Sequence, residues 1–328
     1  MTPIVPATLG QFGDLIAEDI QKIFVQRANV PREMEKYFTV ENTSSYYDKD
    51  SSIVGGGRAK YASENAGVIY DAPIQGFDKT YTQKKYFYGD KITQHAWKFG
   101  FEARKLTNFV EGMMDAVDNN IEICAADMLN NGWGTAYNDD DNQSVSTAGG
   151  DATAYFSASH TREDGGTAWN NIVYDGTTYN MDFEYDALKA ARKTATAIVN
   201  GKGLPLGINL DTLIAKQGSS VQDRYEELMG AISRNYIPGG DENDGAAKVG
   251  LPKALFLKYL DNDAYWYAFD SSKKNDKFGL QWRWSEKPNM LPAELDYDTQ
   301  EYRRQVYYFA DRGANNMRSW VAANGTNT

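Results

Sequence analysis

The longest regular pattern of apolar positions in the chain covers residues 103–131. Apolar side chains recur there at intervals of three and four residues, the spacing that gathers them on one face of an α-helix. The residues on this stripe are Leu106, Val110, Met113, Val117, Ile121, Cys124 and Met128. A helix over the whole segment would be roughly 43 Å long at about 1.5 Å per residue. The pattern therefore predicts one long amphipathic helix that stops at the Asn130-Asn131-Gly132 sequence.

A different pattern precedes this helix. Between residues 52 and 92, two stretches rich in Tyr, Thr, Ile, Val and Phe alternate with polar positions. Such a composition favours β-strands, and the alternation indicates that both faces of the strands are partly solvated. We predict an extended β-hairpin over residues 52–92, with its tip near residues 63–71. A hairpin without a core of its own is expected to find burial on another chain.

The rest of the chain mixes helices with strands. Residues 1–51 contain a short helical pattern that Pro31 ends, which indicates an N-terminal arm carrying a short helix. Two further amphipathic helices are predicted at residues 182–199 and 220–233. Strand-like runs occupy residues 211–215, 251–260, 264–270, 280–284 and 301–312. Because these elements do not follow the strict βαβ alternation of a doubly wound sheet, the predicted class is α+β.

Composition narrows the range of functions. The 328 residues are 41% hydrophobic, which is typical of a globular protein, and their net charge of −11 is unlike that of a nucleic-acid binder with a basic stripe. An acidic wall repels phosphate and is compatible with a container in which packaged DNA slides. The sequence has neither a run of about eighteen apolar residues nor the pattern of a secretory leader. We therefore expect a soluble protein that does not associate with membranes.

The sequence offers few residues for catalysis. His95 and His160 are the two histidines, and Ser157 and Ser159 lie close to the second in sequence. A catalytic triad needs a partner in space and an orienting carboxylate, and the Gly-x-Ser-x-Gly elbow of serine hydrolases is absent from the sequence. Cys124, the single cysteine, lies on the apolar stripe and is interpreted as a core residue. We expect no catalytic site, no cofactor and no metal centre.

Other interpretations remain open at this point. The 45 acidic residues, 22 Tyr and 7 Trp are compatible with a carbohydrate-active or carbohydrate-binding protein, because glycosidases use paired carboxylates. Aromatic residues are equally typical of protein interfaces. The acidic segments 137–150 and 239–245 lack the ligand spacing of an EF-hand and are interpreted as solvated loops.

Four short sequences stand in a distinctive order along the chain. They are EICAADMLNNGW at the end of the long helix, Phe156-Ser157 with His160, Gly165-Gly166-Thr167 with Asn170, and ADRGANNMRSW at residues 310–320. In this order they resemble the major capsid proteins of tailed bacteriophages, whose shared architecture is the Hong Kong 97 type fold. The resemblance covers nearly the whole chain, and it implies that these motif residues are structural.

The resemblance implies a division of the chain. Residues 1–51 would be an N-terminal arm, and residues 52–92 the extended loop that reaches over a neighbouring subunit. Residues 93–181 would form the peripheral domain, with the long helix as its spine. Residues 182–296 would form the axial domain around the capsomer axes. The last segment, 297–328, would return as a strand to the peripheral domain or its junction.

The resemblance also implies a function and partners. The chain would be a structural subunit of pentamers and hexamers in an icosahedral shell that encloses double-stranded DNA without sequence-specific binding. Its partners would be copies of itself, a portal protein and a separate scaffold protein, since only about fifty residues precede the loop; a decoration protein is a further candidate. Assembly would take place in the host cytoplasm, and the product would be the virion. The alternative is an encapsulin-like compartment shell with the same fold and an enzyme cargo.

Overall fold

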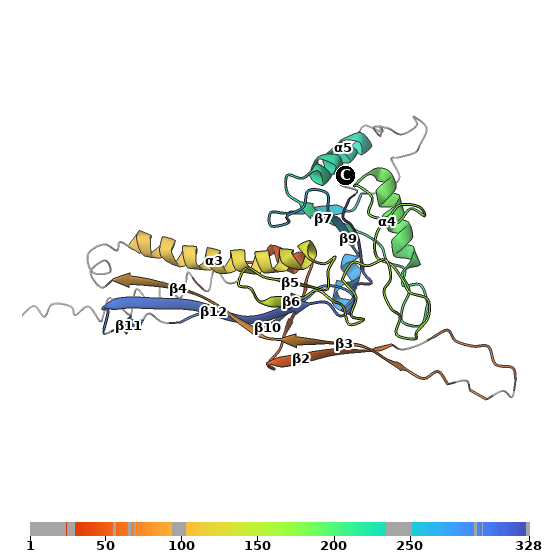
Figure 1. Ribbon diagram of the computed structural model, residues 1–328, viewed down its shortest axis with the longest axis horizontal. Coiled ribbons are helices and arrows are strands. Elements are labelled where there is room, and N and C mark those ends of the chain that lie inside the picture. The colour runs from red at the N-terminus through yellow and green to blue at the C-terminus, as the bar shows by residue number, and fades with distance from the viewer. Residues whose placement is uncertain are drawn as a thin grey trace, which may run out of the picture.

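The computed structural model is an elongated molecule with a long flat part, a taller part and a projecting hairpin (Figure 1). It describes residues 24, 30–54, 57–64, 67–68, 70–93, 103–233, 251–291, 294–296 and 298–325. The helices described are η1 (Glu33–Lys36), α3 (Ala103–Asn130), α4 (Tyr185–Ala197), α5 (Ser220–Ser233) and η3 (Ser271–Asp276). The strands are β1 (Thr39–Asn42), β2 (Tyr47–Val54), β3 (Ile74–Thr82), β4 (Lys84–Thr93), β5 (Ala136–Asn138), β6 (Ser144–Ser146), β7 (Thr212–Lys216), β8 (Lys253–Leu257), β9 (Trp266–Phe269), β10 (Gln281–Met290), β11 (Glu294–Asp296), β12 (Glu301–Gly313) and β13 (Trp320–Ala323). This mixture confirms the α+β class.

Helix α3 lies along a five-stranded sheet built around the long strand β12 (Figure 1). β12 pairs antiparallel with β10, β11 and β4, while β1 pairs with β10 in parallel. Val306 and Tyr308 of β12 are buried in the same core cluster as the apolar stripe of α3 from Val110 onward. Asn120 of the helix donates a hydrogen bond to the Tyr308 hydroxyl at 2.7 Å. The stripe predicted from the sequence is therefore the face that the helix packs against the sheet.

A four-stranded sheet in the order β13-β9-β7-β8 forms the taller part, together with α4 and α5 (Figure 1). Strand β9 has a core on each of its two faces. Tyr267 and Phe269 belong to the cluster that contains α3, whereas Trp266 and Ala268 belong to a second cluster that contains α4. Because successive side chains of a strand point to opposite faces, this sheet joins the two parts of the molecule into one body.

The predicted hairpin is present, but its extent differs from the prediction. β2 pairs antiparallel with β3 from Tyr47↔Thr82 to Val54↔Ile74, so the hairpin starts before residue 52. Residues 84–93 were expected to complete the returning strand, yet they form β4 and pair with β12. Alternating polar and apolar residues reveal a strand but not its partner, which depends on burial in the whole fold.

The sheets also group the chain differently from the segments expected from the sequence. Strands β10 and β11 fall within residues 182–296, expected to be axial, but both pair in the sheet that α3 covers. Within residues 297–328, β12 lies in that sheet and β13 in the four-stranded one. The expected arm of residues 1–51 includes a packed part, because Met34 and Phe38 are fully buried in the main core. These contacts join residues far apart in sequence, which local patterns do not reveal.

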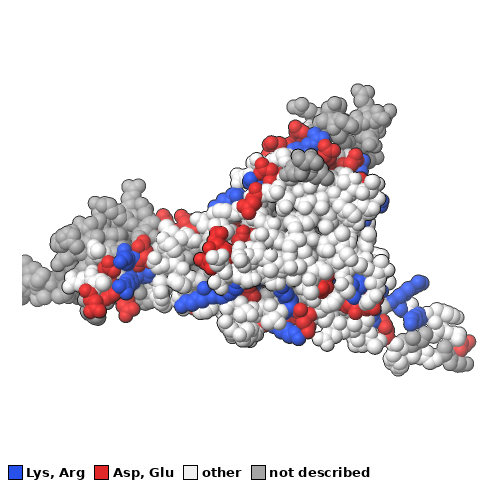
Figure 2. Space-filling view, viewed as in Figure 1, with Lys and Arg blue, Asp and Glu red and all other residues white. Residues whose placement is uncertain are grey.

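Some features singled out in the sequence lie outside the described residues, namely His95, residues 239–245 and nearly all of residues 1–29. None of the described helices is long and apolar enough to cross a membrane. Figure 2 shows one face of the molecule, where acidic and basic residues are interspersed near the edges and the surface of the taller part is largely uncharged.

Candidate functional site

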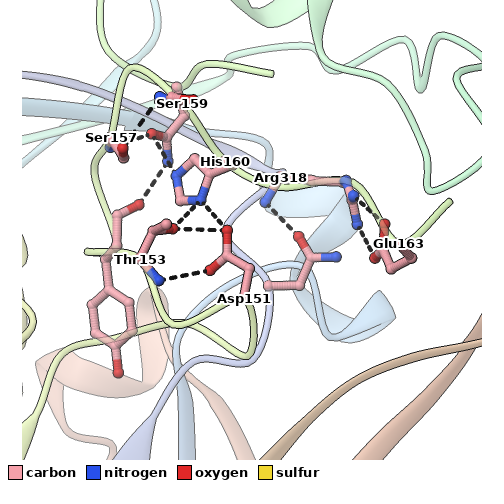
Figure 3. A network of polar contacts seen from close by, with 10 residues as sticks. Asp151, Thr153, Ser157, Ser159, His160, Glu163 and Arg318 are labelled. Atoms are coloured by element: carbon pink, nitrogen blue, oxygen red, sulfur yellow. Dashed lines mark hydrogen bonds and ion pairs between the residues drawn. The ribbon is translucent and has the colours of Figure 1, made fainter. Parts of the chain in front are cut away.

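The segment that follows α3 folds around a buried histidine (Figure 3). His160 is 3% exposed, and its Nδ1 atom lies 2.8 Å from Oδ2 of Asp151 and 2.9 Å from Oγ1 of Thr153. Thr153 also donates a hydrogen bond to Asp151 at 2.7 Å. The second ring nitrogen, Nε2, lies 3.1 Å from Oδ1 of Asn171. These contacts link Asp151 and Asn171, at the two ends of segment 151–171, to His160 near its middle.

Two backbone groups set the orientation of the Asn171 side chain, which is fully buried. Its Oδ1 atom accepts a hydrogen bond from the backbone N–H of Ser157 at 2.9 Å, and its Nδ2 atom donates to the carbonyl of Tyr155 at 2.8 Å. Asp151 and Asn171 thus present acceptor oxygens to both ring nitrogens of His160. The three side chains therefore form one buried hydrogen-bonded cluster.

The surroundings of Asp151 lower the pKa of its carboxyl group. Burial by itself would raise the pKa of Asp151, but the hydrogen bond and charge of His160, together with hydrogen bonds from Thr153, hold it below its usual value. The charged form of Asp151 is therefore favoured although the group is buried. A buried polar network with its partners in place is typical of a rigid structural element.

A second buried ion pair lies beside the histidine (Figure 3). Arg318 donates two hydrogen bonds to Glu163, at 2.8 and 2.7 Å, and neither side chain is more than 4% exposed. Trp169 joins the two clusters. Its ring stacks on His160 with centroids 4.3 Å apart, and the Arg318 guanidinium lies 5.1 Å from its centroid. The segment is thereby tied to the residues that lead into β13.

Phe156 anchors the start of the segment on the end of α3. Its ring is 2% exposed and lies 5.3 Å from the Trp133 ring and 5.2 Å from the Tyr267 ring, measured between centroids. It also packs against Gly132, where an added Cβ would come within 2.7 Å of the ring. The glycine that indicated the helix end in the sequence therefore also makes room for Phe156.

The glycines and the predicted asparagine shape an outer turn of the same segment. Gly165 has a φ of +71°, in the left-handed region that favours glycine. A Cβ on Gly166 would lie 2.7 Å from the guanidinium group of Arg162. Asn170 accepts a hydrogen bond from the backbone N–H of Ile172 at 2.6 Å. These contacts are local, so the three predicted residues form the turn rather than the histidine cluster.

The geometry does not match that of a serine hydrolase. Nε2 of His160, the atom that would activate a serine, faces Asn171. The Ser157 hydroxyl accepts a hydrogen bond from the backbone N–H of Ser159 at 3.2 Å. Burial raises the pKa of the Cys124 thiol, which keeps it protonated and unreactive. Across the described ranges, no group of three or more His, Cys, Asp or Glu side chains is placed to hold a metal ion.

Sequence reasoning found the histidine but missed the residues that complete its surroundings. It selected Asn170, whereas the neighbouring Asn171 contacts His160. Asp151 directly follows the acidic segment 137–150 and was not singled out. Arg318 stood in the ADRGANNMRSW sequence, which the resemblance had marked, although its partner could not be known. The pair of adjacent asparagines was the one local signal for a polar contact here.

Comparisons with known proteins bear on the fold. No protein-family model matches the chain, and no curated protein matches it in sequence. A chain of the capsid of cyanophage P-SCSP1u superposes with a TM-score of 0.54 at 12% identity, covering 91% of this chain and 89% of that one. The capsid of an empty GTA particle gives a TM-score of 0.51 at 10% identity, with 90% and 91% covered. The chain has the fold of phage capsid proteins.

A third structure agrees with this capsid fold. A chain of Mycobacterium phage Adephagia gives a TM-score of 0.50 at 9% identity and covers 90% of this chain and 91% of its own. The likeness therefore extends over about nine tenths of each chain. It confirms the fold that the sequence resemblance implied.

Proposed function

We propose that the chain is a structural shell subunit, the major capsid protein of a tailed bacteriophage. Copies of it assemble into pentamers and hexamers of an icosahedral shell that encloses double-stranded DNA. The capsid fold supports this proposal. The buried polar network around His160 supports a structural role for the motif that contains it rather than a catalytic one, because its groups bind each other.

One observation carries the proposal. The hairpin projects from the body and ends in a loop whose Tyr61, Val68 and Tyr70 side chains are 91%, 73% and 89% exposed (Figure 1). Apolar groups gathered on a projecting loop favour burial against a partner. Phe87 of β4, which pairs with Tyr307 in the middle of β12, is 72% exposed. A subunit with exposed apolar groups both on its hairpin and on its main sheet can form head-to-tail contacts, which close into rings.

We propose new borders for the expected domains. We assign α3 and the β12 sheet to the peripheral domain, and α4, α5 and the four-stranded sheet to the axial domain. The β2–β3 hairpin is the extended loop. Phe156, Ser157 and His160 brace the junction between the two domains, while Gly165, Gly166 and Asn170 shape the turn beside it.

The same proposal includes the enclosed DNA, the partner proteins and the place of assembly. The net charge of −11 is unlike that of a protein that binds nucleic acid through a basic stripe, which favours enclosure of DNA over sequence-specific binding. A portal protein, a separate scaffold protein and a decoration protein are the expected partners. Subunits assemble in the host cytoplasm and end in the virion.

Electron microscopy of the purified full-length chain tests this function. We expect rings of five and six subunits or closed icosahedral particles. A variant with Tyr61, Val68 and Tyr70 all replaced by Ser should fold normally, as judged by circular dichroism, but form no rings. Met229→Ser is the matched control, because Met229 is 49% exposed on α5, away from the hairpin. A wild-type chain that remains monomeric at high concentration would contradict the proposal.

The contents of particles from the native source separate the alternatives. Particles filled with double-stranded DNA are expected for a phage capsid. A folded protein cargo without DNA would instead indicate an encapsulin-like compartment. A monomer that binds polysaccharides would favour the carbohydrate-binding interpretation.

A further inference from the structure

The hairpin is fixed at its base by a buried cluster of charges. Arg283 of β10 is 3% exposed and forms ion pairs with Asp48 and Asp50 of β2 and with Glu41 of β1. Its guanidinium also lies 4.2 Å from the ring centroid of Tyr81 in β3. Removing one member of a buried ion pair leaves an uncompensated charge, so this cluster is difficult to open. It holds both strands of the hairpin on the β12 sheet.

The hairpin touches the body a second time, farther from its base. Lys202, in the turn after α4, lies 2.6 Å from the carboxylate of Asp71 and donates a hydrogen bond to the carbonyl of Ala72 at 3.0 Å. The same carboxylate accepts a hydrogen bond from the backbone N–H of Gly57 at 3.0 Å. A single carboxylate therefore links both sides of the loop to the turn after α4.

Two glycines permit this close approach. A Cβ on Gly57 would lie 2.7 Å from the carboxylate of Asp71. A Cβ on Gly201, next to Lys202, would lie 2.8 Å from the methyl groups of Val54 at the end of β2. A side chain at either position would push the loop away from the body. The two glycines therefore allow the loop to pack against the turn after α4.

The two attachments differ in their exposure to water. In the outer pair, the Asp71 side chain is 55% exposed and that of Lys202 is 11% exposed, whereas Asp50 and Arg283 at the base are 8% and 3% exposed. Ion pairs open to solvent are weak and are screened by salt, while buried pairs are screened much less. The outer attachment therefore opens more easily than the base.

We propose that the Asp71–Lys202 ion pair is a reversible tie that holds the loop on its own subunit, and that its release lets the loop turn about the Arg283 anchor toward a neighbouring copy. The tie lies next to Tyr70, one of the most exposed apolar side chains of the loop. Release of the tie would free the loop to contact a neighbouring copy. This consequence for assembly rests on the proposed function.

Hydrogen exchange on dilute, unassembled full-length subunits tests the tie. Lys202→Met removes the cation while keeping the aliphatic part of the side chain. We expect amides of residues 57–64 and 70–72 to exchange about threefold faster in this variant at low salt, as suits a weak, partly exposed pair. Lys189→Met is the matched control, because it removes an exposed ion pair with Asp186 that lies wholly within α4. Unchanged thermal midpoints would show that both variants are folded.

Two further measurements sharpen the test. The charge-swapped double variant, Asp71→Lys with Lys202→Asp, should restore slow hydrogen exchange. Raising the salt from about 0.05 M to about 0.5 M should speed exchange in the wild type but not in Lys202→Met, since screening acts on the pair. Equal exchange in the wild type and Lys202→Met at low salt would overturn the tie. Ring formation by the wild type, seen by microscopy, decides the proposed function separately.

Discussion

The side-chain oxygen of Asn171 lies 3.1 Å from Nε2 of His160, and the same oxygen accepts a hydrogen bond from the backbone of Ser157. One buried amide thus links the histidine to the chain that surrounds it. With Asp151 on the other ring nitrogen, the polar groups at the centre of the segment satisfy one another. These pairings hold the segment together, and its stability should depend on them.

Asn171→Ala should destabilise the folded chain by about 2–3 kcal/mol, because it leaves His160 Nε2, the Ser157 N–H and the Tyr155 carbonyl without this partner. Asn170→Ala is the control, since it removes one local hydrogen bond and should cost about 1 kcal/mol. Urea unfolding measures both. Equal losses would mean that the amide of Asn171 has no special role.

The buried pair of Glu163 and Arg318 should respond to mutation in a non-additive way. Glu163→Leu alone and Arg318→Met alone should each cost about 3 kcal/mol, because each leaves one buried charge without its partner. The double variant Glu163→Leu with Arg318→Met removes both charges and should recover most of that loss. Free energies of unfolding for the single and double variants provide the check. If the double variant were the sum of the single ones, the two groups would not be coupled.

Gly132→Ala should destabilise the end of α3. The added methyl group would come within 2.7 Å of the Phe156 ring, and overpacking of this kind costs about 2 kcal/mol. Gly134→Ala is a close control, because no atom lies within 3.4 Å of its added Cβ and the nearest are at 3.8 Å. It should change the free energy of unfolding by less than about 0.5 kcal/mol. A thermal midpoint that is equally low in both variants would point to the backbone rather than to Phe156.

Asp127 should give the stability a dependence on pH. Burial raises the pKa of Asp127 from 3.8 to about 6, so between these values the folded chain holds a proton that the unfolded chain has lost. Stability should therefore fall as the pH rises from about 4 to about 6 and stay lower above that range. Asp127→Asn should remove this slope and stabilise the chain at pH 7 by about 1 kcal/mol, a figure reduced because the side chain is only half-buried. A steeper slope in the variant would contradict this.

Local patterns along the sequence determined the helices and the existence of the hairpin. The helix predicted at residues 103–131 is α3, Ala103–Asn130, and the one predicted at residues 220–233 has the same bounds in α5. The period of a helix depends on residues three and four positions apart, so it can be read without knowledge of the fold. Phage capsid architecture could likewise be inferred from the order of short motifs along the chain.

The tertiary structure alone decided which strands pair and which polar groups meet. β4 has the composition of a hairpin strand but pairs with β12, and β13 pairs with β9 through Ala322↔Tyr267. The amide that contacts His160 belongs to Asn171 rather than to its neighbour Asn170. These choices depend on which surfaces are buried together across long separations in the chain, and a one-residue shift reverses the face on which a side chain lies.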